Sequence, residues 1–157
     1  MSDPLVTIEG LKTHFALDEG TVQAVDGVDL SVPRGRTLGV VGESGCGKSI
    51  TAFSLMRMLA SPGRIVAGTI TLNHPEGTAI RLTDLEEDGE EMRAIRGRDI
   101  AMVFQEPMTS LSPVHTVGSQ IVEAVRLHMD LGKAQARQHA VDIMRRVGVP
   151  DPERRFG

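Results

Sequence analysis

The sequence carries one diagnostic stretch, Gly42-Glu43-Ser44-Gly45-Cys46-Gly47-Lys48-Ser49. It fits the phosphate-binding pattern G-x-x-x-x-G-K-S/T at every fixed position. The preceding residues 37–41 are apolar and β-branched, which predicts a buried parallel strand. The following residues 50–59 place apolar side chains on one face of a predicted helix. A strand, a glycine turn and a helix in this order are the context in which the pattern binds phosphate, rather than a chance glycine-rich turn.

Each residue type in this stretch has a chemical reason to be there. The glycines let the chain curl so that successive N–H groups point at phosphate oxygens, and the helix adds the positive end of its dipole. Lys48 is placed to reach the β- and γ-phosphates, and the Ser49 hydroxyl is placed to bind Mg²⁺. The sequence therefore predicts a nucleoside triphosphate site with Mg²⁺ that contains Gly42, Glu43, Ser44, Gly45, Cys46, Gly47, Lys48, Ser49 and Ile50.

Length and composition narrow the class of protein. A chain of 157 residues is long enough for one domain. The net charge of −4 argues against a general nucleic-acid binder, so no nucleic-acid partner is expected. No apolar run approaches the length of a membrane span and the first residues have no secretion signal, which predicts a cytoplasmic protein. Cys46 is the only cysteine, and no histidine close in sequence could activate it, so its backbone N–H is expected to matter.

Patterning predicts two β layers and a helical part. Residues 5–15 and 22–32 read as strands of an antiparallel layer beside a nucleotide-binding α/β core, and residues 68–72 and 79–82 read as two further short strands. Residues 99–104 read as a second buried strand of that core. Residues 117–129 and 133–147 read as helices, the second with a stripe of Ala136, Ala140, Ile143, Met144 and Val147. The acidic residues 84–91 are interpreted as a solvated helix face and not as a metal cluster.

Three further stretches resemble a known family. Residues 22–30, with Gly35 and residues 38–49, resemble the opening of ABC transporter ATPase subunits. Residues 104–113 are similar to the Q-loop of one branch, the importers of dipeptides, oligopeptides and nickel, and so are residues 92–97 just upstream. The resemblance covers nearly all of residues 5–157.

The resemblance implies a fold and a set of roles. The fold is the ABC type of P-loop NTPase, a parallel sheet with helices plus an antiparallel β layer. Phe15 matches the A-loop aromatic that stacks on adenine, although an ordinary core aromatic is the alternative. Gln105 matches the residue that reaches Mg²⁺ and the attacking water, so Lys48 and Gln105 are the catalytic candidates.

The same resemblance implies partners and a location. They are ATP, membrane permease subunits and a second ATPase subunit in a homodimer or heterodimer. ATP binding and hydrolysis in that dimer would energise import of the solute. The protein is then expected at the inner face of the cell membrane, held there by its permease.

The sequence also departs from the family. The signature motif Leu-Ser-Gly-Gly-Gln, the Walker B aspartate with its catalytic glutamate, the D-loop and the switch histidine do not appear in it. Residues 148–157 resemble the approach to the signature motif, so residues 1–157 are expected to be the amino-terminal part of a nucleotide-binding domain. Such a fragment should bind ATP but hydrolyse it negligibly, because the clamp for transition-state charge and the base for water are missing.

Three alternatives stay open from the sequence alone. Residues 100–106 could be a degenerate Walker B strand with Glu106 as the base. The chain could be a small nucleotide kinase whose lid contains Arg145, Arg146, Arg154 and Arg155. It could also be a non-catalytic fragment that docks on permease subunits through residues 105–120.

Overall fold

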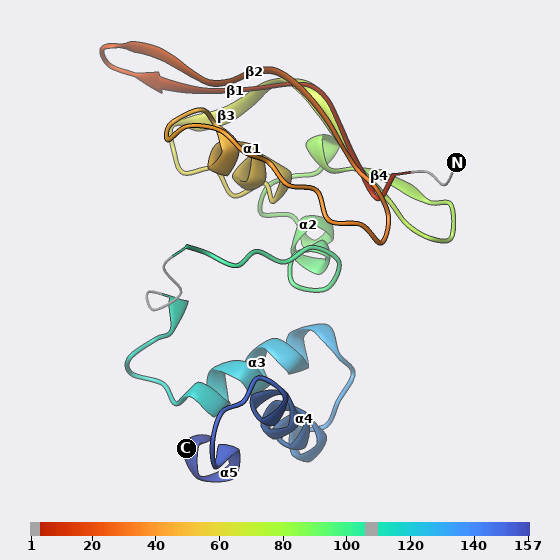
Figure 1. Cartoon of the computed structure of the whole chain (residues 1–157), viewed down its shortest axis with the longest axis vertical. Coiled ribbons are helices and arrows are strands. Elements are labelled where there is room, and N and C mark those ends of the chain that lie inside the picture. The colour runs from red at the N-terminus through yellow and green to blue at the C-terminus, as the bar shows by residue number, and fades with distance from the viewer. Residues whose placement is uncertain (1–3, 106–109) are drawn as a thin grey trace. The chain divides into compact units, whose positions relative to one another are not determined.

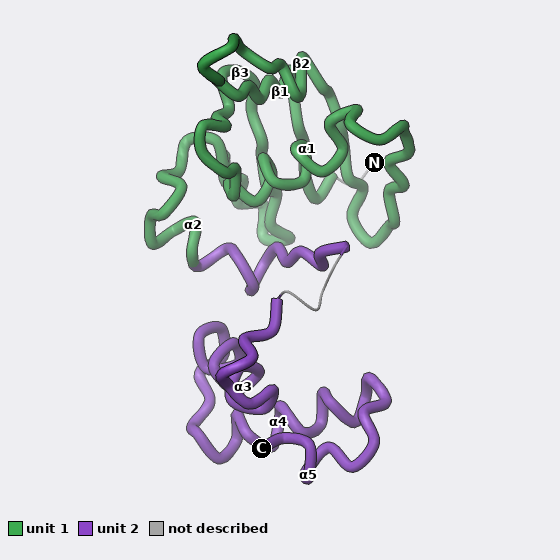
Figure 2. Tube along the Cα trace, turned by 90° about the vertical axis from the view of Figure 1, so that its left-hand side faces the viewer, with its two compact units in different colours: residues 1–93 green, residues 94–157 purple. Residues whose placement is uncertain are grey.

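The chain forms two compact units, the first up to residue 93 and the second over residues 94–157 (Figure 2). The structure is a computed structural model, and it describes residues 4–105 and 110–157. The first unit contains the sheet and the predicted phosphate-binding stretch. The second unit is helical.

An antiparallel sheet organises the first unit (Figure 1). It consists of β1 (Val6–Leu17), β2 (Gly20–Val32), β3 (Gly63–Asn73) and β4 (Ala79–Arg81), in the order β2-β1-β3-β4. Every pair of neighbours is antiparallel, and Ile8 of β1 lies opposite both Leu30 of β2 and Ile70 of β3. The antiparallel layer predicted for residues 5–32 is therefore confirmed, and β3 and β4 extend it. Strands β1, β2 and β3 are longer than the sequence pattern indicated, and β4 is one residue shorter.

The core of this unit lies on one side of β1 and β3. Its fully buried side chains include Ile8, Leu11 and Ile70, each of which contributes about 1.5–3 kcal/mol when removed from water. Helix α1 (Lys48–Leu55) packs against β1 and β2 (Figure 1). A short 3₁₀ turn, η1 (Leu82–Asp84), follows β4, and α2 (Glu90–Ile95) comes next. Of the acidic residues 84–91, Asp84 ends the 3₁₀ turn and Glu90 and Glu91 begin α2, so the single helix predicted over this stretch is not formed.

The two strands predicted for the parallel sheet are not strands in the structure. Residues 37–41 and 101–104 have no regular secondary structure, and residues 96 and 100 form only an isolated parallel bridge. Val41 is 97% exposed and Val103 is 92% exposed. A strand is held by hydrogen bonds to a neighbouring strand, and no described residue pairs with either segment. The predicted parallel sheet is thus absent from the described residues, and this part of the fold prediction is corrected.

Helices α3 (Val117–His128), α4 (Lys133–Arg146) and α5 (Pro152–Arg155) make up most of the second unit. The Thr116 hydroxyl caps α3 by accepting a hydrogen bond from the backbone N–H of Ser119. The predicted stripe of α4 is largely confirmed, although Val147 at its end is 72% exposed. The buried residues of this helix are Ala136, Ala140, Val141 and Met144.

Near its end the chain returns to α3 and α4. The Phe156 ring lies 4.1 Å below the guanidinium carbon of Arg137, a cation–π contact. Gly118 of α3 donates its backbone N–H to the Phe156 carbonyl over 3.1 Å. Within the described ranges 4–105 and 110–157, no helix is long and apolar enough to cross a membrane.

Candidate phosphate-binding site

Two glycines give the loop before α1 its shape. Gly45 has φ of 82° and Gly47 has φ of 92°, in the left-handed region that glycine enters without strain. Gly47 also has no room for a side chain, because a Cβ there would lie 2.5 Å from the Ala24 carbonyl oxygen of β2. The loop therefore curls as the sequence predicted, and it rests directly on the main chain of the sheet.

Lys48, the first residue of α1, closes the loop from inside. Its ammonium group donates hydrogen bonds to the carbonyl oxygens of Gly42, at 2.8 Å, and Glu43, at 2.6 Å. The Cys46 sulfur lies 3.3 Å from the same nitrogen. One positive charge is thus held within the turn of the loop, where it can attract an anion.

No described side chain caps the start of α1. Gly47 is its N-cap residue and offers no side chain to cap it, and the first turn holds no acidic residue. The first N–H groups of a helix have no partner within the helix, and the dipole makes this end attractive to anions. Ser49 is exposed and Ile50 is partly exposed at this end of the helix. The predicted residues 42–50 thus form one continuous loop and helix start, with the Lys48 ammonium group hydrogen-bonded within the loop.

Buried hydroxyl groups fix α1 to the sheet. The Thr13 and Ser54 hydroxyl oxygens lie 2.8 Å apart, and both residues are fully buried. Ser54 also donates to the Ile50 carbonyl over 2.7 Å, and the Thr51 hydroxyl donates to the Gly47 carbonyl over 3.0 Å. These contacts hold the phosphate-binding loop and its helix in place relative to β1.

Phe15 lies close to the loop along the sheet. It belongs to β1, is partly exposed, and pairs with Val22 of β2 and Gly63 of β3. Gly47 of the loop contacts Ala24, which is two residues after Val22 on β2. Val22, the neighbour of Phe15, and Ala24, the neighbour of Gly47, are therefore about 7 Å apart along this strand. The structure thus places the predicted aromatic and the predicted phosphate loop on neighbouring positions of one unit.

Gln105 belongs to the second unit, where it is an exposed residue in a bend. Residues 106–109 of the Q-loop stretch, and with them Glu106, lie outside the described residues. The Walker B alternative required a strand immediately before Glu106, and residues 101–104 form none. That alternative loses its structural basis.

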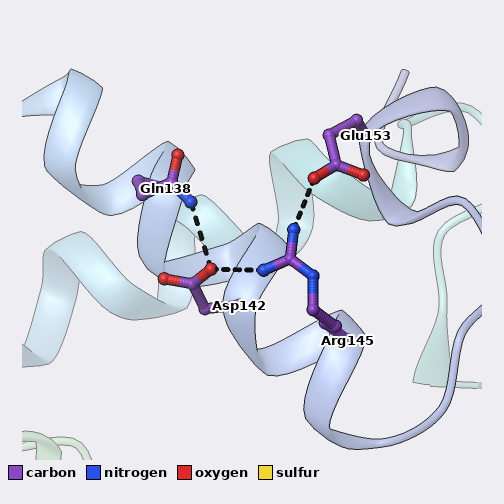
Figure 3. A network of polar contacts seen from close by, with 4 residues as sticks. All are labelled: Gln138, Asp142, Arg145 and Glu153. Carbon is purple, nitrogen blue, oxygen red and sulfur yellow. Dashed lines mark hydrogen bonds and ion pairs between the residues drawn. The ribbon is translucent and has the colours of Figure 1, made fainter.

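One of the arginines proposed for a kinase lid is already engaged (Figure 3). Arg145 bonds to Asp142 over 2.7 Å and to Glu153 over 2.5 Å. Gln138 donates to the same Asp142 oxygen over 3.0 Å. Two carboxylates thus balance the guanidinium charge locally, which leaves it poorly suited to hold a phosphate.

Sequence reasoning missed the residues that support the site. Ser54 gave no local signal, because its position in the predicted helix is opposite the apolar side chains of residues 52, 53, 55, 56 and 59. Its partner Thr13, and the contact of Gly47 with Ala24, depend on packing between segments far apart in the sequence. No local pattern reveals such contacts.

The family model for ABC transporters matches residues 25–157, and the chain therefore belongs to the ABC transporter family. It is 48% identical over 155 residues to a Brucella abortus (strain 2308) protein named for peptide import and ATP binding. It is 40% identical over 153 residues to the dipeptide transport ATP-binding protein DppD of Escherichia coli (strain K12). These matches cover 98% and 97% of the chain but only 45% and 44% of the two relatives.

A solved structure supports the fold assignment. The dimeric structure of the ATP-binding cassette MJ0796 in a post-hydrolysis state, bound to ADP and Pi, matches with a TM-score of 0.72 and 20% identity. The match covers 89% of this chain and 56% of that one. The family match also makes the kinase alternative the weaker interpretation of the phosphate-binding loop.

Proposed function

We propose that this chain binds ATP with Mg²⁺, as the amino-terminal part of the nucleotide-binding domain of an ABC importer. The observation that carries the proposal is the loop before α1. Gly45 and Gly47 curl it through left-handed φ values, and its Gly42 and Glu43 carbonyls hold the ammonium group of Lys48. A curled main chain, a free helix start and a lysine charge suit the triphosphate part of a nucleotide.

Different residues of the site would bind different parts of MgATP. The backbone N–H groups of residues 42–50 would receive phosphate oxygens, and Lys48 would exchange its carbonyl partners in part for the β- and γ-phosphates. The Ser49 hydroxyl is exposed and available to Mg²⁺, which supplies charge neutralisation between the phosphates. Gln105 is proposed as a second contact to the metal. Phe15 would stack on the adenine base.

The transport role rests on the relatives. Two of them are named for peptide or dipeptide transport, which supports a di- or oligopeptide importer, with nickel as the other solute of this branch. The proposed partners are permease subunits and a second ATPase subunit, because the similar cassette MJ0796 is dimeric. The proposed location is the inner face of the cell membrane, through the permease.

The chain itself is proposed to bind ATP without appreciable turnover. Hydrolysis needs a base for the attacking water and donors that stabilise charge in the transition state. The sequence of 157 residues holds no signature motif and no Walker B aspartate with its glutamate. Activity would therefore belong to the complete domain in its dimer.

Calorimetric titration with MgATP tests the binding proposal. Lys48→Ala should lower ATP affinity at least tenfold, because a charge-assisted contact of roughly 1.5–3 kcal/mol is lost. Lys12→Ala is the matched control: it removes the same charge from β1, where Lys12 pairs with Asp26 at the surface. Equal affinity in the Lys48 variant and the wild type would refute the phosphate-loop assignment.

A further inference from the structure

Gly63, the first residue of β3, lies directly opposite Phe15 of β1. Its φ is outside the left-handed region, so its backbone conformation is open to any amino acid. The reason for a glycine at this position is therefore not conformational. It must be sought in what surrounds the α-carbon.

The Phe15 ring fills the space that a side chain at position 63 would need. A Cβ on Gly63 would lie 2.5 Å from Cε1 and 2.8 Å from Cζ of that ring, the far edge of the aromatic side chain. It would also lie 2.9 Å from the Ala60 carbonyl oxygen. That oxygen is fixed, since it accepts the backbone N–H of Gly63 over 2.8 Å. A methyl group at position 63 therefore has to displace the ring, and the backbone at Ala60 has to shift as well.

We propose that Gly63 is a positioning residue, which places the Phe15 ring for stacking on the base of the nucleotide. Its missing side chain lets the Phe15 ring reach across from β1 onto the start of β3, and this contact sets the orientation of the ring. The proposal rests on the proposed function, in which Phe15 stacks on the planar base of a nucleoside triphosphate. Phe15 remains partly exposed in this position, so part of its ring is available to a ligand.

The contact predicts that a change at Gly63 affects binding of the base but not binding of the phosphates. The phosphates are bound by residues 42–50, which do not include Gly63 or Phe15. A displaced ring should weaken binding of the base and leave binding of the phosphates intact. Inorganic tripolyphosphate, which has no base, is the probe for the second part.

The test compares MgATP and magnesium tripolyphosphate affinities of Gly63→Ala and the wild type. ATP affinity should fall roughly threefold to tenfold, the range expected for loss of an aromatic stacking contact, and tripolyphosphate affinity should change less than about twofold. Gly132→Ala is the matched control, because a Cβ there meets only a side-chain oxygen of Gln135, at 3.6 Å. Equal losses for both ligands would overturn the proposal and indicate a general folding defect.

A double-mutant cycle shows whether Gly63 acts through the ring. In a Phe15→Ala background the ring is gone, so Gly63→Ala should cost no further ATP affinity. A loss that persists in this background would come from the Ala60 carbonyl and would overturn the proposal. Retained ATP affinity in Gly63→Ala, beside clear losses in Phe15→Ala and Lys48→Ala, would overturn it while leaving the proposed function standing.

The ring contact itself can be measured without any ligand. Protons held over or beside an aromatic ring have shifted NMR signals, so the Gly63 Hα signals should move toward random-coil positions in Phe15→Leu. Unchanged signals would contradict the contact on which the proposal stands. If neither Lys48→Ala nor Phe15→Ala weakens ATP binding, the proposed function fails, and the assignment of Gly63 fails with it.

Discussion

The hydroxyl of Thr13 on β1 donates its proton to the hydroxyl of Ser54 on α1. The two oxygens lie 2.8 Å apart and both residues are fully buried. The direction follows from a count of protons, since Ser54 has one and gives it to the Ile50 carbonyl over 2.7 Å. This pair connects the strand that carries Phe15 with the helix that follows the phosphate-binding loop.

The direction of this hydrogen bond predicts unequal effects of removing its two ends. Ser54→Ala leaves the Thr13 donor buried without a partner, which should lower the free energy of unfolding by about 1–3 kcal/mol. Thr13→Val leaves Ser54 bonded to Ile50 and should cost about 0.5–1.5 kcal/mol. Urea unfolding, followed through the amide signals of β1, measures both.

The double variant is the control for this argument. With both hydroxyls replaced by apolar groups, no donor is left unsatisfied, so Thr13→Val should partly rescue Ser54→Ala. Strictly additive losses would contradict the hydrogen bond between the two hydroxyls, and a larger loss in Thr13→Val than in Ser54→Ala would contradict its assigned direction.

The surface ion pair between Lys12 and Asp26 predicts a lowered pKa for the Asp26 carboxyl, which can be measured. Lys12 lies 2.7 Å from Asp26, and its hydrogen bond, followed by its charge, lowers the pKa of the Asp26 carboxyl below the ordinary value of 3.8. A lowered pKa stabilises the fold above the ordinary value, and this contribution is lost as the pH falls through the folded-state pKa. In Lys12→Met the Asp26 pKa should therefore rise, as followed by NMR titration of its carboxyl carbon. An Asp26 pKa that is the same in both proteins would show that the pair does not form in solution.

The packing around Gly118 predicts that its replacement by alanine lowers stability, the opposite of the usual effect of this substitution in a helix. Replacing a glycine inside a helix by alanine usually stabilises the helix by about 1 kcal/mol. In α3, however, a Cβ at position 118 would collide with the carbonyl oxygen and the ring of Phe156. Gly118→Ala should therefore lower the thermal stability of the second unit and weaken the contact of Phe156 with Arg137. A raised melting temperature would contradict this packing.

Local patterns predicted the parts of the fold that local interactions hold. Alternating apolar residues and turn residues located β1 and β2, and the glycines at positions 45 and 47 located the loop because their φ values are positive. The first helix ends at Leu55, earlier than predicted, and Arg57 just beyond it takes a left-handed φ of 52°. Apolar periodicity alone could not reveal that turn.

The features that the sequence did not predict depend on contacts between segments far apart in the chain. Residues 37–41 are apolar and β-branched, yet a strand also needs a neighbour, and none pairs with them among the described residues. The roles of Gly63 and Thr13 come from the ring of Phe15 and the hydroxyl of Ser54, each more than 40 residues away in sequence. Side-chain packing of this kind is set by the assembled sheet.

Amide chemical shifts measured during a titration with Mg²⁺ and a non-hydrolysable ATP analogue test the phosphate loop most directly. We expect the largest changes at the N–H groups of residues 42–50, which should receive the phosphate oxygens, and the same titration of Lys48→Ala should lose most of them. Saturable shifts elsewhere in the chain, with those amides unmoved, would contradict the assignment of this loop as the nucleotide site.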